Sequence, residues 1–255
     1  MSSMINPLSL ITGASIAGVA AYLGTLMLSR RMSLVAGPLG HLTLPGIALA
    51  LIYGFDITLG AFPFVILGII LIWLFELRTK LPMEALTAVV FASSVAMAFL
   101  FLPIEQAKAA LVGDISRVEL WDTLFSFLLS LLIFLVLRKC YLKMVLINIS
   151  EDLAKVQGID VKKYNLIYLA LIAIVVALGV KVVGGLLTAA LVAIPAAASR
   201  NVSKNLFQYS TLASIFGILS CVLGIFLSEL YKIPAGVSII LVNTTIFLLT
   251  SILKR

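Results

Sequence analysis

The stretches of this chain that lack ionisable side chains set the strongest limit on its fold. Nine such windows of 15 to 29 residues follow one another, if His41 is set aside in the second. They are residues 1–29, 32–55, 57–75, 85–104, 123–137, 164–180, 182–199, 205–228 and 233–253. A bilayer with a hydrocarbon core about 30 Å thick needs about 20 mostly apolar residues for each crossing helix.

The composition excludes a soluble domain, since 62% of the 255 residues are hydrophobic and only 11% are charged. We therefore predict an all-α polytopic membrane protein, a bundle of about 8 to 9 transmembrane helices. The count stays open because only Lys181 separates two neighbouring windows, so a half-length segment can lie there. No stretch is typical of a soluble domain or a linker, which makes residues 1–255 a single transmembrane domain.

The distribution of Lys and Arg predicts the orientation. With the N-terminus outside, 14 of the 18 basic residues fall on the inner side, as the retention of positive loops in the cytoplasm requires. The sequence thus predicts a multi-pass protein of the cytoplasmic (inner) membrane with its C-terminus in the cytoplasm. The net charge of +7 is then explained by retention and by contact with anionic membrane lipid, and we expect no nucleic-acid partner.

Catalytic motifs are missing from the sequence. It contains no glycine-rich phosphate loop, nucleophile elbow or zinc-protease motif. The predicted spans hold one histidine and no acid well inside, too few groups for an intramembrane enzyme. We predict no catalytic residues and no resident cofactor.

One predicted span carries unusual helix breakers. Pro38 and Pro45 flank His41, the only histidine, in a segment that also contains Gly37, Gly40 and Gly46. Irregular backbone at membrane depth is tolerated only beside protein or a water-filled cavity, and transporters place ion sites in such discontinuous helices. From the residues alone, His41 is either a buried hydrogen-bonding side chain or a ligand in an ion pathway.

The longest hydrophilic inner segment, residues 148–165, has the marks of a short helix. Ser150 can cap it, Glu151 and Asp152 suit the positive end of its dipole, and Gly158 can end it in a left-handed conformation. The spacing leaves two interpretations equally open: a solvated interfacial loop, or a docking helix for a cytosolic partner.

Four motifs in order resemble one family. They are "RRMSLVAGPLGHLTLPGIALA", "LVGDISRVELWDTL", the inner segment continued through "GVKVVGGLLTAALVAIPAAASR", and "IPAGVSIILV". Together they are similar to the permease subunits of the metal-ion ABC transporters, the ABC-3 family, over nearly the whole chain.

The resemblance implies the permease fold of the vitamin B12 and siderophore importers. It implies a homodimer that works with a separate cytosolic ABC ATPase and an extracellular or periplasmic metal-binding protein, and that moves zinc, manganese or iron. Residues 150–158 would form the coupling helix, with Glu151, Ala154, Lys155 and Gly158 at the ATPase. His41 would meet the metal ion at the break made by Pro38 and Pro45.

The chain departs from the family pattern at two places. Ala36 and Gly37 stand where a Gly-Asp pair is common before the histidine, and Lys232 stands where an acid often precedes the last Pro-x-Gly. The other ligands could then be carbonyls freed by Pro45, the Thr43 hydroxyl, water, or His41 of a second subunit. The rival from another class is a channel or facilitator that needs no ATPase.

Overall fold

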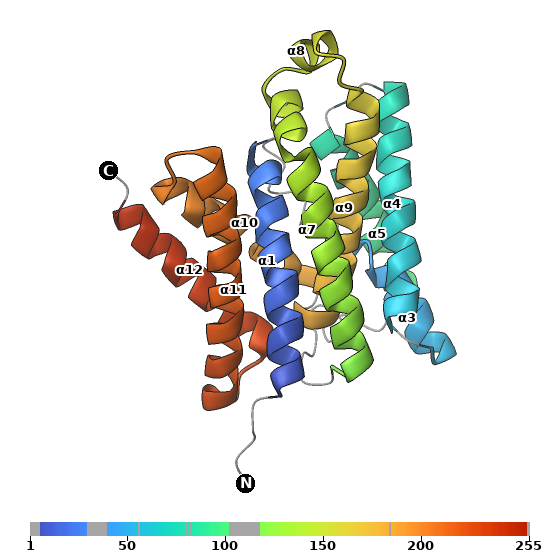
Figure 1. Ribbon diagram of the computed structural model, residues 1–255. Helices are drawn as coiled ribbons and strands as arrows, with labels where there is room; N and C mark the ends of the chain where they lie inside the picture. Colours follow the sequence, from blue (N-terminus) through green and yellow to red (C-terminus); the bar gives the residue numbers. More distant parts are fainter. Residues whose placement is uncertain are drawn as a thin grey trace.

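The computed structural model describes residues 6–29, 40–55, 57–79, 81, 83–101, 118–183 and 185–253, and its regular structure there is entirely α-helical. Ten helices are defined: α1 (Pro7–Ser29), α3 (Leu44–Tyr53), α4 (Ile57–Thr79), α5 (Met83–Phe101), α7 (Leu120–Ile149), α8 (Glu151–Val156), α9 (Val161–Val183), α10 (Gly185–Val202), α11 (Leu206–Tyr231) and α12 (Ala235–Ile252). Most stand side by side as a bundle (Figure 1).

Six of these helices are long and apolar enough to cross a membrane, namely α1, α4, α7, α9, α11 and α12. The predicted count of 8 to 9 spans is not confirmed. The apolar part of α5, Ala85–Phe101, is shorter than a full span. At 1.5 Å per residue the 10 residues of α3 extend only about 15 Å, half of the hydrocarbon thickness.

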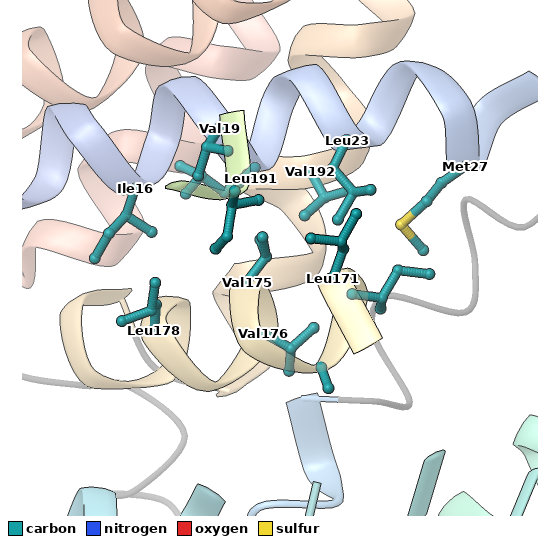
Figure 2. Close-up of a cluster of buried hydrophobic side chains, with 14 of the residues drawn as sticks. Ile16, Val19, Leu23, Met27, Leu171, Val175, Val176, Leu178, Leu191 and Val192 are labelled. Atoms are coloured by element: carbon teal, nitrogen blue, oxygen red, sulfur yellow. The ribbon is translucent and has the colours of Figure 1, made fainter. Parts of the chain in front are cut away.

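Helix α1 is the central element of the bundle. Its apolar window is 78% buried, against 28% for the windows of α7 and α12, and it contacts α7, α9, α10 and α11. Ile16, Leu23 and Met27 of α1 point toward Val175 of α9 and Leu191 of α10 (Figure 2). This cluster joins the N-terminal helix to the C-terminal half of the chain.

Small residues bring the central helices into close contact. A Cβ added to Gly24 of α1 would overlap the carbonyl of Val192 in α10, and one added to Gly217 of α11 would stand 2.7 Å from the carbonyl oxygen of Ala17. Such backbone approach is how helices associate in lipid, where apolar side chains gain little by leaving the acyl chains.

The two ends of the bundle differ. Helix α8 protrudes beyond the ends of α7 and α9, whereas the start of α1 lies at the opposite end, together with the turn between α11 and α12 (Figure 1). The ends of the molecule are called below the α8 end and the α1-start end.

Candidate functional site

The predicted helix break is present beside His41. Gly40 and His41 are helical, Leu42 and Thr43 form a turn, and α3 begins at Leu44. Pro38 and Gly37 lie outside the described residues, as do residues 111–117 of the predicted external loop.

Pro45 explains why the hydrogen-bond ladder is interrupted at this point. Proline has no N–H, so Pro45 cannot donate to the carbonyl of His41 four residues earlier. The hydroxyl of Thr43 donates to the carbonyl of Gly40 at 2.7 Å, which leaves its oxygen able to accept or to ligate. The backbone N–H of Ile47 resumes the ladder by donating to the carbonyl of Thr43 at 2.9 Å.

The His41 side chain is half-buried and faces α5. Its ring centroid lies 5.2 Å from that of Phe91, with the planes inclined by 56°. Thr87, four residues before Phe91 and therefore on the same face of α5, is also buried. The sequence analysis did not identify Phe91 as a neighbour of His41, because no local pattern indicates which helix packs against the break.

Helix α3 is held against α4 by two glycines. A Cβ on Gly46 would overlap the carbonyl of Gly60, and a Cβ on Gly60 would overlap that of Gly46. Leu42, just before α3, packs onto Gly68, which lies about two helical turns beyond Gly60 on α4. The break is thereby wedged between α4 and α5, and His41 is fixed at the edge of this packing.

Among the described residues, no three side chains of His, Cys, Asp or Glu come together in a way that could hold a metal ion. The groups that could act as ligands here are the imidazole nitrogen of His41, the hydroxyl of Thr43 and the backbone carbonyl of His41, to which Pro45 cannot donate. One nitrogen with neutral oxygen ligands is a weak set, and weak binding suits an ion that passes through.

The inner hydrophilic segment is helical where the sequence predicts it. The hydroxyl of Ser150 accepts a hydrogen bond from the backbone N–H of Leu153 at 3.2 Å, so it is the N-cap of α8. Gly158 adopts φ +73°, the left-handed conformation expected at the end of the helix. Both end signals predicted from the sequence are confirmed.

The side chains of α8 divide into an anchor and an exposed face. Ala154 is fully buried with Ile147 of α7 and Val161 of α9, so it faces the bundle and attaches α8 to it. Glu151, Asp152 and Lys155 are exposed, and Lys155 pairs with Asp152 at 3.2 Å. Of the four predicted coupling residues, Glu151, Lys155 and Gly158 are therefore at the surface and Ala154 is not.

The exposed face of α8 is also apolar. Leu153 is 50% and Val156 87% exposed at the α8 end of the molecule. Six residues with three charges cannot span a membrane, so α8 lies outside the hydrocarbon core. Its exposed face combines two aliphatic side chains with charged ones.

Lys232 has a structural role at the α1-start end. It is the C-cap of α11 with φ 56°, and its N–H donates to the carbonyl of Ser228. A cation suits the negative end of the helix dipole. The departure from the family pattern at this position is thus accommodated by the end of α11.

The family comparison matches almost all of the chain. Residues 3–254 match the model described as "ABC 3 transport family". The manganese import system permease protein ScaB of Streptococcus gordonii is 28% identical over 246 residues, covering 95% of this chain and 88% of that protein. The high-affinity zinc uptake system membrane protein ZnuB of Haemophilus influenzae is 27% identical and covers 97% and 96%.

Solved structures agree with the fold. The structure titled "PsaBC from Streptococcus pneumoniae in complex with Fab" superposes with a TM-score of 0.82 at 26% identity, over 96% of this chain and 90% of that one. An inward-facing conformation of a putative metal-chelate type ABC transporter gives 0.74 at 20% identity, covering 96% and 84%. The second likeness concerns the fold alone.

Proposed function

The chain belongs to the ABC 3 transport family, and from this premise we propose that it is the membrane permease of an ABC importer for a divalent transition-metal ion. Manganese and zinc are named for its relatives, and iron has similar ligand preferences. The chain is not an enzyme; in this family ATP is hydrolysed by a separate subunit. Like its relatives, it is a multi-pass membrane protein, and we place it in the cytoplasmic membrane.

The single observation that carries this proposal beyond the family is α8. A channel or facilitator has no need for an exposed, capped helix that presents Leu153 and Val156 beyond the bundle. A coupling element has that need, since it must be rigid enough to transmit movement and must offer apolar area to a partner. The buried Ala154 supplies the attachment to α7 and α9.

We assign the contact with the ATPase to the exposed face of α8. Glu151 and Lys155 would contribute charge complementarity, and Leu153 and Val156 would contribute apolar area. Gly158 would set the direction in which the chain returns to α9. Ala154 belongs to this element as its anchor.

We assign the ion pathway to the break beside His41. The helical structure described there is interrupted at Leu42 and Thr43, just before Pro45, and His41 is the only imidazole of the chain. We expect Pro38 to contribute to the same break. Two permease chains would complete the ligand set, because one His and neutral oxygens do not hold a divalent ion tightly. In this arrangement the α8 end is cytoplasmic, the N-terminus is outside, and an extracellular or periplasmic metal-binding protein delivers the ion to the α1-start end.

Uptake of metal by cells tests the function. A strain that lacks the chain should lose energy-dependent accumulation of ⁵⁴Mn or ⁶⁵Zn, and a plasmid copy should restore it only with an ATPase subunit able to hydrolyse ATP. Restoration with a catalytically dead ATPase would identify a channel or facilitator and refute the proposal.

Accessibility of single cysteines tests the orientation in the same cells. In a background without Cys140 and Cys221, Lys155→Cys on α8 and Tyr231→Cys at the other end should react from opposite sides with an impermeant thiol reagent. Labelling of Lys155→Cys from outside would reverse the proposed topology.

A further inference from the structure

A groove lies between α7 and α11, with α1 as its floor. Helix α1 stands between these two helices in the bundle (Figure 1). The groove has a volume of about 310 Å³. The floor contains the small residues Ala14 and Gly18 of α1. Phe127 and Leu131 of α7 form one wall, and Ser214 of α11 is part of the opposite wall. The aromatic and aliphatic residues of the α7 wall are exposed. Nothing in the ion pathway or in α8 uses this surface.

Polar side chains follow the lining of the groove toward the α8 end, one helical turn further along each helix. Tyr22 follows Gly18 by four residues on α1, and Arg138 follows Phe134 by four on α7. Ser210 precedes Ser214 by four on α11, which runs in the opposite direction (Figure 1). Residues four apart lie above one another on a helix. Tyr22, Arg138 and Ser210 therefore lie at about the same height along the bundle, one turn closer to the α8 end than the groove lining.

Contacts between side chains show that α1 and α7 meet at this height. The ring of Tyr22 lies 5.2 Å from Phe134 and 5.2 Å from Tyr141, in both cases edge-on. The Tyr141 hydroxyl is 3.0 Å from that of Thr25. Beyond the end of the groove, α1 and α7 are therefore joined by buried aromatic rings and hydroxyls.

A positive charge stands at the same height. Arg138 is exposed on α7, four residues beyond Phe134, whose ring contacts that of Tyr22. Residues 123–137 of α7 carry no charge, so Arg138 marks the point where the helix leaves the hydrocarbon. A guanidinium in that position can reach the headgroup layer and pair with phosphate in a bidentate manner.

The distance along α7 from Arg138 to the far end of the groove matches the depth of one leaflet of the membrane. Arg138 and Phe127 are 11 residues apart, about 16 Å along the helix at 1.5 Å per residue, and one leaflet of the hydrocarbon core is about 15 Å deep. An acyl chain that starts at the level of Arg138 would therefore reach the far end of the groove.

We propose that this groove is a binding site for one anionic phospholipid of the leaflet at the α8 end. Its phosphate pairs with the exposed Arg138, and one acyl chain lies between α7 and α11 over Ala14 and Gly18. In the topology given above this is the cytoplasmic leaflet, which carries the anionic lipids that attract basic side chains. The inference requires only that the chain resides in a membrane and is independent of the transported ion.

Lipid retention by the purified complex of permease and ATPase tests the site. We expect phosphatidylglycerol to copurify in mild detergent at about one molecule per permease chain, quantified by mass spectrometry of extracted lipid. Added phosphatidylglycerol should raise the melting temperature more than phosphatidylcholine does. Arg138→Gln should lower the copurified phosphatidylglycerol at least fivefold and abolish that difference, while Arg138→Lys should retain part of it.

Matched controls separate the groove from general effects. Lys139→Gln removes a neighbouring charge from another face of α7. Ser214→Leu should fill the groove and expel the lipid, whereas Ser93→Leu on exposed α5 should not, although both serines donate to the carbonyl four residues earlier.

Three outcomes overturn the proposal. The first is unchanged phosphatidylglycerol in both Arg138→Gln and Ser214→Leu, and the second is an equal loss of phosphatidylglycerol in the two control variants. The third concerns Ser130, which lines the groove, is 4% exposed and has no hydrogen-bond partner for its hydroxyl among the described residues. If Ser130→Ala changes the number of protein subunits in the complex and leaves the lipid content unaltered, the groove seats a helix and not a lipid.

Discussion

Helices α3 and α8 are both short, yet they occupy opposite environments. Helix α3 begins beside Pro45 and ends at Gly54 with φ 71°, and α8 begins at Ser150 and ends before Gly158 with φ 73°. The residues of α3 are apolar and mostly buried between α4 and α5, whereas half of those in α8 are charged and only Ala154 is buried. Similar end signals thus serve one helix inside the bundle and another outside it.

The difference shows what fixes a short helix in each environment. A helix of fewer than about 12 residues is marginal by itself. Helix α3 is held by backbone contact between Gly46 and Gly60, so it tolerates no added volume. Helix α8 depends on its cap, its glycine and one buried alanine, so local changes should affect it without disturbing the bundle.

The largest expected effect is at the glycine contact of α3. The methyl group added by Gly46→Ala would overlap the carbonyl of Gly60. Because the backbone of α4 would have to move away, we expect the bundle to be destabilised by about 3 kcal/mol. The free energy of unfolding in mixed micelles measures it. Gly54→Ala is the control, since its Cβ would meet nothing within 4 Å and only the positive φ is disfavoured. Equal destabilisation by both variants would mean that the contact with α4 is unimportant.

The next largest effect is expected at His41, in the proposed ion pathway just before α3. His41→Ala should reduce metal uptake by at least about tenfold, equivalent to about 1.4 kcal/mol, while assembly with the ATPase and basal ATP hydrolysis persist. His41→Gln keeps hydrogen bonding but ligates poorly. Uptake by reconstituted complexes distinguishes the two roles: if Gln restores it, His41 only satisfies a buried polar contact and is not a ligand.

A smaller effect is expected at the end of α8. Gly158→Val must adopt φ near +73°, which disfavours a β-branched residue by about 1–2 kcal/mol. Affinity for the ATPase should fall between about fivefold and 30-fold, with an unchanged melting temperature of the bundle. Gly158→Asn, which tolerates the left-handed region, is the matched control. Normal assembly and ATP turnover by the Val variant would exclude α8 as the docking element.

The smallest effect is at the N-cap of α8. Ser150→Ala removes the acceptor for the N–H of Leu153 and should destabilise the helix by about 1 kcal/mol. Faster hydrogen exchange confined to residues 151–156 is the expected result, and Ser150→Asp should reverse it. Unchanged exchange in the Ala variant would show that the attachment through Ala154 alone maintains α8.

Several features could be predicted from the sequence because they are local. The charge-free windows indicated an all-helical membrane protein, Pro45 predicted an interruption beside His41, and Ser150 and Gly158 predicted both ends of α8. Each follows from the length, the missing N–H, the side-chain oxygen or the absent Cβ of particular residues. The four motifs together also identified the family now matched over residues 3–254.

Other features were decided only by the tertiary structure, because they depend on which helices meet. The sequence could not show that Phe91 faces His41, that Gly46 contacts Gly60, or that Ala154 is buried and so anchors α8. Nor could it place Gly18, Phe127 and Ser214 along one groove. In an almost uniformly apolar chain, hydrophobicity no longer distinguishes a buried face from one that faces lipid. Shape complementarity between helices then selects the neighbours, and it exists only once the helices are packed.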